Sequence, residues 1–133
     1  MTATAHTAAE IITVFGEAIR DGRIDDVQSL YEPDAVFIPQ PGAQPVSGSA
    51  AIRAALAPFA QLKPTMTGDI LKVVHAGDIA TVLNRWQLHA TAPDGTPVRM
   101  GGTSADVMRR RPDGTWGILI DDPWGAATTD QHQ

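Results

Sequence analysis

Asp106 lies in the middle of a segment that alternates in the manner of a β-strand, residues 98–110. Alternation places Ser104, Asp106 and Met108 on one face of that strand. If other elements cover this face, burial would raise the pKa of the carboxyl group and poise it as a proton donor or a general acid or base. On an open face, Asp106 would instead pair with an arginine of a neighbouring strand.

A second acidic candidate, Asp121, ends the segment 115–121, in which Leu119 and Asp121 share one face and Ile118 the other. Two aspartates on adjacent strands beside one cavity would form an acid–base pair, because like charges raise one pKa and leave the other group ionised. The alternative is that Asp121 or Asp122 only caps the strand end or binds a loop amide.

The segment 79–89 places Asn84 and Trp86 on the same face. Trp86 would form a flat apolar wall and Asn84 a neutral donor and acceptor, as in a pocket for a flat apolar ligand. The alternative is that Trp86 belongs to the core alone. Four further candidate ligand contacts come from the helices, a loop and the end of the last strand: Phe15, Tyr31, Gln40 and Trp124.

Helical spacing of apolar residues predicts helices over 7–20, with Thr7 as N-cap and Glu10 as its capping-box partner, and over 24–31. A short strand at 34–38 and a Pro/Gly loop precede a third helix, capped at Ser47-Gly48-Ser49 and ending near Lys63. Four long strands follow, at 65–75, 78–91, 98–110 and 115–121. Helices followed by consecutive antiparallel strands predict an α+β layered domain.

Three sequence segments resemble those of a known family: YEPDAVFIPQPG, SGSAAIRAAL and RRRPDGTWGILIDDPWG. They resemble the SnoaL-like and DUF4440 branch of the NTF2-like superfamily, often called ketosteroid isomerase-like. The resemblance covers about residues 7–125. It implies a cone in which three N-terminal helices pack on a strongly curved, mainly antiparallel sheet. The superfamily includes isomerases, epoxide hydrolases, cyclases, dehydratases and non-catalytic domains, so the fold does not fix the reaction.

Alignment without gaps to ketosteroid isomerase places three functional positions of that enzyme on this chain. Its catalytic base falls on Pro39, its oxyanion tyrosine on Phe15, and its protonated aspartic acid on Asp106. The same alignment turns Leu119 and Asp121 inward. Because Pro39 cannot accept a proton and Phe15 has no hydroxyl group, the resemblance does not imply ketosteroid isomerisation itself.

Composition excludes several classes of function. The net charge is -5 and Arg109–Arg111 is the only basic run, so nucleic acid is not an expected partner. No apolar stretch reaches the roughly 20 residues that span a bilayer, and the N-terminus lacks a signal-peptide pattern. The absence of cysteine fits the cytoplasm. Neither histidine spacing nor a nucleotide motif predicts a metal or another cofactor.

The sequence therefore predicts one domain over 1–133, ordered over about 7–125, with frayed ends at 1–5 and 126–133. We expect a pocket protein that acts on an apolar carbonyl or polycyclic compound by aspartate acid–base chemistry, as an isomerase, cyclase, dehydratase or hydrolase. The alternative is a non-catalytic module that binds a hydrophobic ligand or dimerises. A homodimer is expected because Leu83, Val107 and Ile118 would leave an apolar outer sheet face in water.

Overall fold

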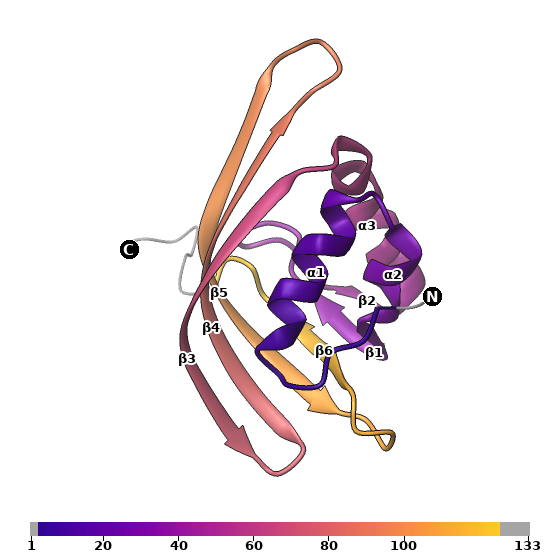
Figure 1. The fold of residues 1–133 in the computed structure, drawn as a ribbon, viewed down its shortest axis with the longest axis vertical. Coiled ribbons are helices and arrows are strands. Elements are labelled where there is room, and N and C mark those ends of the chain that lie inside the picture. Colours follow the sequence, from indigo (N-terminus) through magenta and orange to yellow (C-terminus); the bar gives the residue numbers. More distant parts are fainter. Residues whose placement is uncertain (1–2, 126–133) are drawn as a thin grey trace.

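A computed structural model describes residues 3–125 as three helices packed on one face of a six-stranded sheet (Figure 1). The helices are α1 (Glu10–Arg20), α2 (Ile24–Ser29) and α3 (Ser49–Leu62). In the turn before α1, the Thr7 hydroxyl accepts the Glu10 N–H at 3.0 Å, and the Glu10 carboxylate accepts the His6 N–H at 2.9 Å. These two bonds satisfy donors that the first helical turn leaves unpaired.

Each predicted helix differs from the structure at one end or more. Helix α1 begins at Glu10 with Ala9 at its N-cap, not at the predicted N-cap Thr7. Helix α2 stops at Ser29, and Tyr31 begins a strand in which it stays buried. Helix α3 has Gly48 at its N-cap with φ 89°, and no serine side chain caps it. Its C-terminus is Lys63 in the left-handed region, φ 48°, followed by Pro64.

The sheet is strongly curved around the helices (Figure 1). Its strands run in the order β2-β1-β6-β5-β4-β3. Only β1 and β6 pair in parallel, so the predicted mainly antiparallel sheet is confirmed. Strand β2 was not predicted, because two residues carry no alternation. The bounds are β1 (Tyr31–Phe37), β2 (Val46–Ser47), β3 (Thr65–Ala76), β4 (Ile79–Thr91), β5 (Pro97–Arg110) and β6 (Trp116–Asp121).

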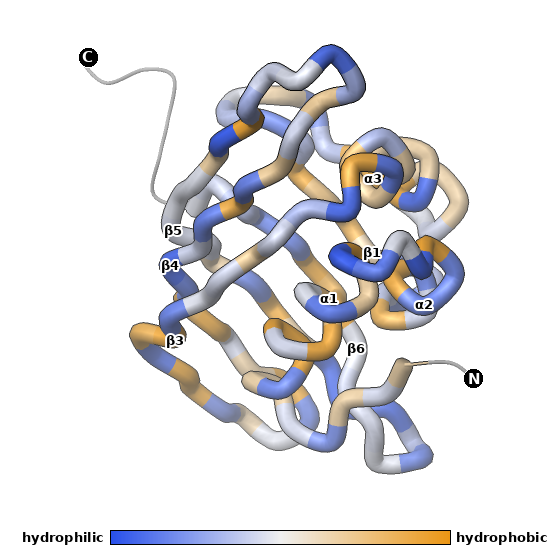
Figure 2. Tube along the Cα trace, turned by 45° about the horizontal axis from the view of Figure 1, so that its top comes forward, coloured by the Kyte–Doolittle hydropathy of each residue, from blue (hydrophilic) through white to orange (hydrophobic). Residues whose placement is uncertain are grey.

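The core lies between the helices and the inner face of the sheet, where hydrophobic segments of both layers meet (Figure 2). Its largest fully buried side chains include Ile11, Ile19, Leu30 and Met108. Ala5 is also fully buried and its carbonyl accepts the Trp116 N–H at 2.8 Å, although the sequence placed it in a frayed end. Residues 1–2 and 126–133 of the predicted frayed ends lie outside the described residues.

A β-bulge in β6 changes which side chains face inward. Val107 and Met108 are consecutive on β5, but they pair with Ile120 and Ile118, so Leu119 is the extra residue. Ile118 is 3% exposed and belongs to the core, so its predicted place on the outer face is wrong. After the bulge the alternation resumes in opposite phase, which brings Asp121 to the inner face.

Candidate functional site

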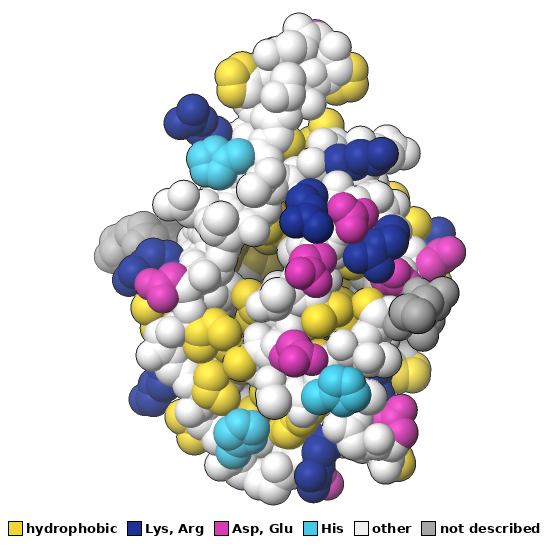
Figure 3. Space-filling model, in the orientation of Figure 1, with side chains coloured by type: hydrophobic (Ala, Val, Ile, Leu, Met, Phe, Trp, Pro, Cys, Tyr) yellow, Lys and Arg dark blue, Asp and Glu magenta, His cyan; other side chains and the backbone are white. Residues whose placement is uncertain are grey.

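A cavity of about 130 Å³ opens between α1, α3 and the inner face of the sheet. Hydrophobic side chains gather on the molecular surface where the strands meet the helices (Figure 3). Most of the lining is apolar, with Phe15, Met108 and Ile118 among the lining residues. Aliphatic and aromatic walls around a few polar groups are typical of small-molecule sites. The polar residues of the lining belong to strands β3 to β6: Thr67, Asn84, Ser104, Asp106 and Asp121.

Asp106 projects from β5 into this cavity and is 6% exposed. One carboxyl oxygen, Oδ1, accepts the backbone N–H of Asp122 at 3.0 Å, which fixes the orientation of the group. Burial is the largest cause that raises the pKa of Asp106 well above its ordinary value, and the charge of Asp121 raises it further. Asp106 therefore favours the protonated form, with its second oxygen free to carry the proton.

Asp121 lies beside Asp106 and has a different set of partners. The hydroxyl group of Tyr31 donates a hydrogen bond to Asp121 Oδ2, and the Asp106 carboxyl group is hydrogen-bonded to Asp121 as well. Burial raises the pKa of Asp121 to about 6, while the bonds from Tyr31 and Asp106 oppose that rise. The pair thus has two donors directed at Asp121, which favours one proton on Asp106 and a charge on Asp121.

Tyr31 contacts the acid pair through its hydrogen bond to Asp121, although it does not line the cavity itself. Its side chain is 3% exposed, and its ring packs edge-on against Phe15 of α1 at 6.4 Å between centroids. Burial and the Asp121 charge raise the pKa of the Tyr31 hydroxyl well above its ordinary value, so it stays a donor at neutral pH. The sequence placed Tyr31 near the pocket, but no pattern connected it with Asp121, ninety positions away.

The segment after β6 closes one side of the cavity. The Pro123 carbonyl accepts the indole N–H of Trp86 at 2.7 Å, and the Trp86 and Trp124 rings meet edge-on at 5.5 Å between centroids. Gly102 lies beneath this contact, since a Cβ there would approach the Pro123 carbonyl to 3.2 Å. The two tryptophans therefore form the aromatic wall that the sequence predicted for Trp86 alone.

Two buried polar atoms beside the cavity have no hydrogen-bond partner within residues 3–125: Asn84 Oδ1 and Trp124 Nε1. Asn84 is 4% exposed and lies on β4, opposite Ser104 of β5. The Ser104 hydroxyl donates to the backbone carbonyl of Asn84 at 3.2 Å, so it leaves the Asn84 side chain free.

Most residues singled out in the sequence line this cavity, but Gln40, Leu119 and Tyr31 do not. Gln40 is exposed in the loop after β1, outside the lining, because Pro39 occupies the inward position there. Leu119 is also absent from the lining, because the β6 bulge turns Ile118 inward in its place. Sequence reasoning missed Ile118 and the methionines Met66 and Met100, whose inward positions the alternation of β3 and β5 could have indicated.

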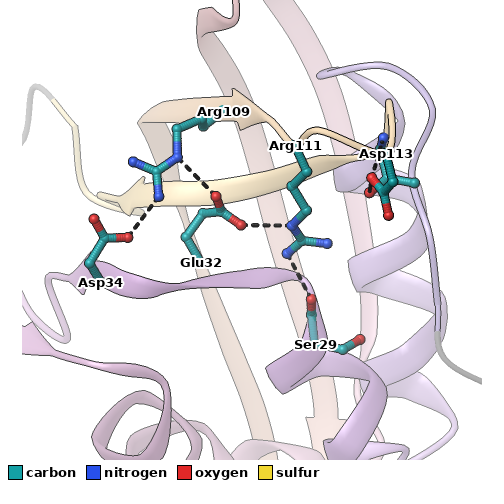
Figure 4. A network of polar contacts seen from close by, with 7 residues as sticks. Ser29, Glu32, Asp34, Arg109, Arg111 and Asp113 are labelled. Carbon is teal, nitrogen blue, oxygen red and sulfur yellow. Dashed lines mark hydrogen bonds and ion pairs between the residues drawn. The ribbon is translucent and has the colours of Figure 1, made fainter.

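The arginine run Arg109–Arg111 lies outside the cavity, in ion pairs (Figure 4). Glu32 is 6% exposed, and its carboxylate accepts bonds from Arg109 at 2.9 Å and from Arg111 at 2.7 Å. Arg109 also reaches Asp34 at 2.8 Å, and Arg111 donates to the Ser29 carbonyl. The network joins α2, β1 and β5, as expected for arginines that pair with acids across strands.

Within residues 3–125, no three histidine, aspartate or glutamate side chains gather closely enough to hold a metal ion. No described helix combines the length and the apolar character needed to cross a membrane.

The sequence profile of the SnoaL-like domain matches residues 12–116. This match covers most of the chain, so the protein belongs to the SnoaL-like domain family. No functionally curated protein matches the sequence.

Solved structures of the NTF2-like class share the fold. An NTF2-like superfamily protein from Salmonella enterica is 20% identical, with 90% of this chain and 89% of that chain covered and a TM-score of 0.74. A proposed dehydratase of the NTF2-like family from Streptomyces avermitilis is 20% identical, covering 85% and 89%, with a TM-score of 0.70. A proposed calcium/calmodulin dependent protein kinase II association domain from Xanthomonas campestris is 20% identical, covering 92% and 94%, with a TM-score of 0.73. At these identities the similarity shows the fold alone.

Proposed function

We propose that this protein binds a small apolar carbonyl compound and acts on it by acid–base chemistry, as an isomerase, cyclase, dehydratase or hydrolase. The observation that supports this proposal is the pair of carboxyl groups, Asp106 and Asp121, in contact inside an apolar cavity. Acids with unequal surroundings that share one proton are suited to give and take protons near neutral pH. Dehydration, the reaction proposed for the Streptomyces neighbour, is one reaction of this class.

The environments of the two acids assign their roles. Ionised Asp121, held by the Tyr31 hydroxyl, takes a proton from the carbon next to the carbonyl group. The electron pair of the broken C–H bond moves onto the carbonyl oxygen, and protonated Asp106 turns its hydrogen bond from Asp121 to the developing negative charge. Return of the proton from Asp121 to the same or another carbon completes exchange or isomerisation. In dehydration, Asp121 instead gives the proton to a hydroxyl group on the next carbon, which leaves as water while the carbonyl group and a carbon–carbon double bond form.

The lining limits the size and type of the ligand. Pro39 and Phe15 both face the cavity, at the positions where ketosteroid isomerase has its base and its oxyanion tyrosine, so the proposal excludes that activity. An apolar cavity of about 150 Å³ in another protein holds benzene. The volume of about 130 Å³ therefore favours a single-ring carbonyl compound over a polycyclic one.

Deuterium exchange tests this chemistry without knowledge of the natural substrate. Acetophenone and cyclohexenone are incubated with the protein in heavy water, and deuterium at the carbon next to the carbonyl is followed by NMR. We expect protein-dependent exchange that falls at least about 100-fold in Asp106→Asn and in Asp121→Asn. Asp69→Asn, at an exposed position of β3, is the matched control and keeps the wild-type rate.

Exchange at the background rate with wild-type protein would contradict the acid–base proposal. If these ketones still bound in the cavity, the protein would be a non-catalytic module for a hydrophobic ligand. The apolar lining is the feature that favours this second function.

We also propose that two copies associate through the outer face of the sheet. Leu83 and Val107 lie there on adjacent strands, and Ile120, 37% exposed, occupies the place predicted for Ile118. The lack of cysteine supports the cytoplasm as the compartment.

A further inference from the structure

The side-chain oxygen of Asn84, Oδ1, is a buried polar atom for which residues 3–125 provide no hydrogen bond. Asn84 is 4% exposed, its Oδ1 atom has no partner, and the amide faces the cavity. Folded proteins pair nearly all buried polar atoms, because an unpaired one loses its bonds to water without replacement. An unpaired amide oxygen in the cavity wall therefore indicates a polar group on the ligand.

The fold makes room for this amide in a specific way. A Cβ on Gly68 of β3 would lie 2.9 Å from Asn84 Oδ1 and 2.9 Å from the Ile12 side chain of α1. Any residue with a side chain at position 68 would therefore displace the amide or the helix. The absence of a side chain at Gly68 leaves a slot between β3 and α1, and Asn84 occupies its wall.

The position of Asn84 relative to the acid pair fixes the span of the ligand. Asn84 pairs with Ser104 on β5, and Asp106 is the next inward residue on that strand. Such diagonal strand positions lie roughly 7–8 Å apart, which leaves room above the sheet for one ring with a substituent at each end. Trp86, the next inward residue of β4, lies on the side of Asn84 away from Asp106, so its ring borders the Asn84 end of this space.

We propose that the ligand is a single-ring carbonyl compound with a hydroxyl group across the ring, and that Asn84 binds this hydroxyl group. A carboxamide both accepts and donates hydrogen bonds, and a hydroxyl group does the same, so the two match in either orientation of the amide. This inference rests on the proposed function, because the acid pair receives the carbonyl end. Asn84 then determines specificity, since a ligand without the hydroxyl leaves the amide unpaired.

Two ligands of the same shape test the proposal by binding alone. Para-hydroxyacetophenone and para-methylacetophenone differ by a hydroxyl in place of a methyl group, and their affinities are measured by titration calorimetry. We expect the wild type to bind the hydroxyl compound about 10-fold more tightly, against the order that hydrophobicity alone would give. In Asn84→Leu, which keeps the side-chain shape, the order reverses. The control Gln40→Leu, at an exposed position outside the lining, keeps the wild-type order.

Three results would overturn the inference: equal affinities in the wild type, preference for the methyl compound, or hydroxyl preference retained in Asn84→Leu. Failure of both compounds to bind would overturn the pocket as well. Deuterium exchange separates this inference from the proposed function. Aspartate-dependent exchange without hydroxyl preference leaves the acid–base function standing, whereas hydroxyl preference without exchange leaves a hydroxyl-specific binding module.

The stability of the unliganded protein provides an independent readout. A residue kept for ligand binding is not optimal for folding, so Asn84→Leu should melt at the wild-type temperature or above it. If Asn84→Leu lowers the melting temperature by more than about 5 °C, the amide has a structural role and the inference is wrong.

Discussion

The hydroxyl group of Tyr31 lies against the Asp121 carboxylate, inside a region that otherwise disfavours charge. Burial raises the pKa of Asp121 to about 6, and the hydrogen bond from Tyr31 opposes this rise more than any other contact. Without the Tyr31 hydroxyl group, less would oppose the effect of burial, and the pKa of Asp121 would rise further. The acid pair should respond to this single oxygen atom through its titration, even though Tyr31 does not line the cavity.

We predict that Tyr31→Phe moves the ionisation of Asp121 to higher pH. The rate of deuterium exchange, which requires ionised Asp121, should rise through about pH 6 in the wild type and at higher pH in the variant. NMR titration of the Asp121 carboxyl carbon measures the pKa of Asp121 directly and does not depend on catalysis. An unchanged titration midpoint would show that the Tyr31 bond does not tune this acid.

Asp106→Asn should make the protein more stable at neutral and higher pH. The pKa of Asp106 is raised in the folded state, so the protonated form stabilises the fold. This contribution is complete below the ordinary aspartate pKa of about 3.9, and it is lost as the pH rises through the raised pKa. An asparagine side chain is neutral at every pH, and its amide oxygen can still accept the hydrogen bond from the Asp122 N–H.

The melting temperature checks this sign. Asp106→Asn should exceed the wild type by a few degrees at about pH 8, and the difference should shrink near pH 4. Asp69→Asn, at an exposed site, should track the wild type at both pH values. A variant less stable than the wild type at about pH 8 would mean that the Asp106 carboxylate is stabilised by the fold.

At the scale of elements, the sequence predicts the helices and long strands well and fails where two patterns overlap. Helix α1 and strands β3 to β5 follow clear periods, and their bounds agree within three residues. Tyr31 fits both the helical spacing after Val27 and the start of a strand, so periodicity alone could not decide. Strand alternation, together with a face covered by helices, was enough to predict that the Asp106 side chain faces the cavity.

The β6 bulge shows a limit of alternation. Strict alternation from Trp116 through Ile118 would turn Asp121 away from the core. The extra residue, Leu119, reverses the phase, and nothing in the local sequence marks it. The gapless family alignment turned both Asp121 and Leu119 inward; the structure has Asp121 in the cavity lining but not Leu119.

Strand β6 also depends on a glycine for its packing. A Cβ at Gly117 would lie 2.6 Å from Glu32 Oε2 and 2.6 Å from Arg111 Nη2, inside the ion-pair network of Figure 4. We predict that Gly117→Ala destabilises the fold by about 1–3 kcal/mol. Gly16→Ala in α1 is the control, since its Cβ would meet only ordinary contacts at 3.8 Å and alanine favours the helix.

Denaturant unfolding of the two alanine variants measures this difference. Gly16→Ala should be as stable as the wild type or more stable, and Gly117→Ala clearly less stable. Equal stability of Gly117→Ala and the wild type would show that Glu32 and Arg111 can move aside without loss, and that the network does not hold β6 in place.

For the whole molecule, curvature of the sheet separates two surfaces with different uses. The concave face meets the helices (Figure 1), and the residues that line the cavity come from both layers. The opposite face carries apolar side chains between charged ones, with Leu83 opposite Ala105 and Val107 opposite Ile120. An apolar strip with a polar rim is typical of interfaces between subunits.

The chain should therefore be a homodimer, with about twice the 14.1 kDa mass of one copy in light scattering after size exclusion at micromolar concentration. Leu83→Arg should shift it to the monomer mass, because a charge at the centre of the strip would be buried without a partner. His89→Arg, at an exposed position further along β4, is the control and should stay dimeric. A wild-type monomer, or a Leu83→Arg dimer, would show that copies of this chain do not meet through this face.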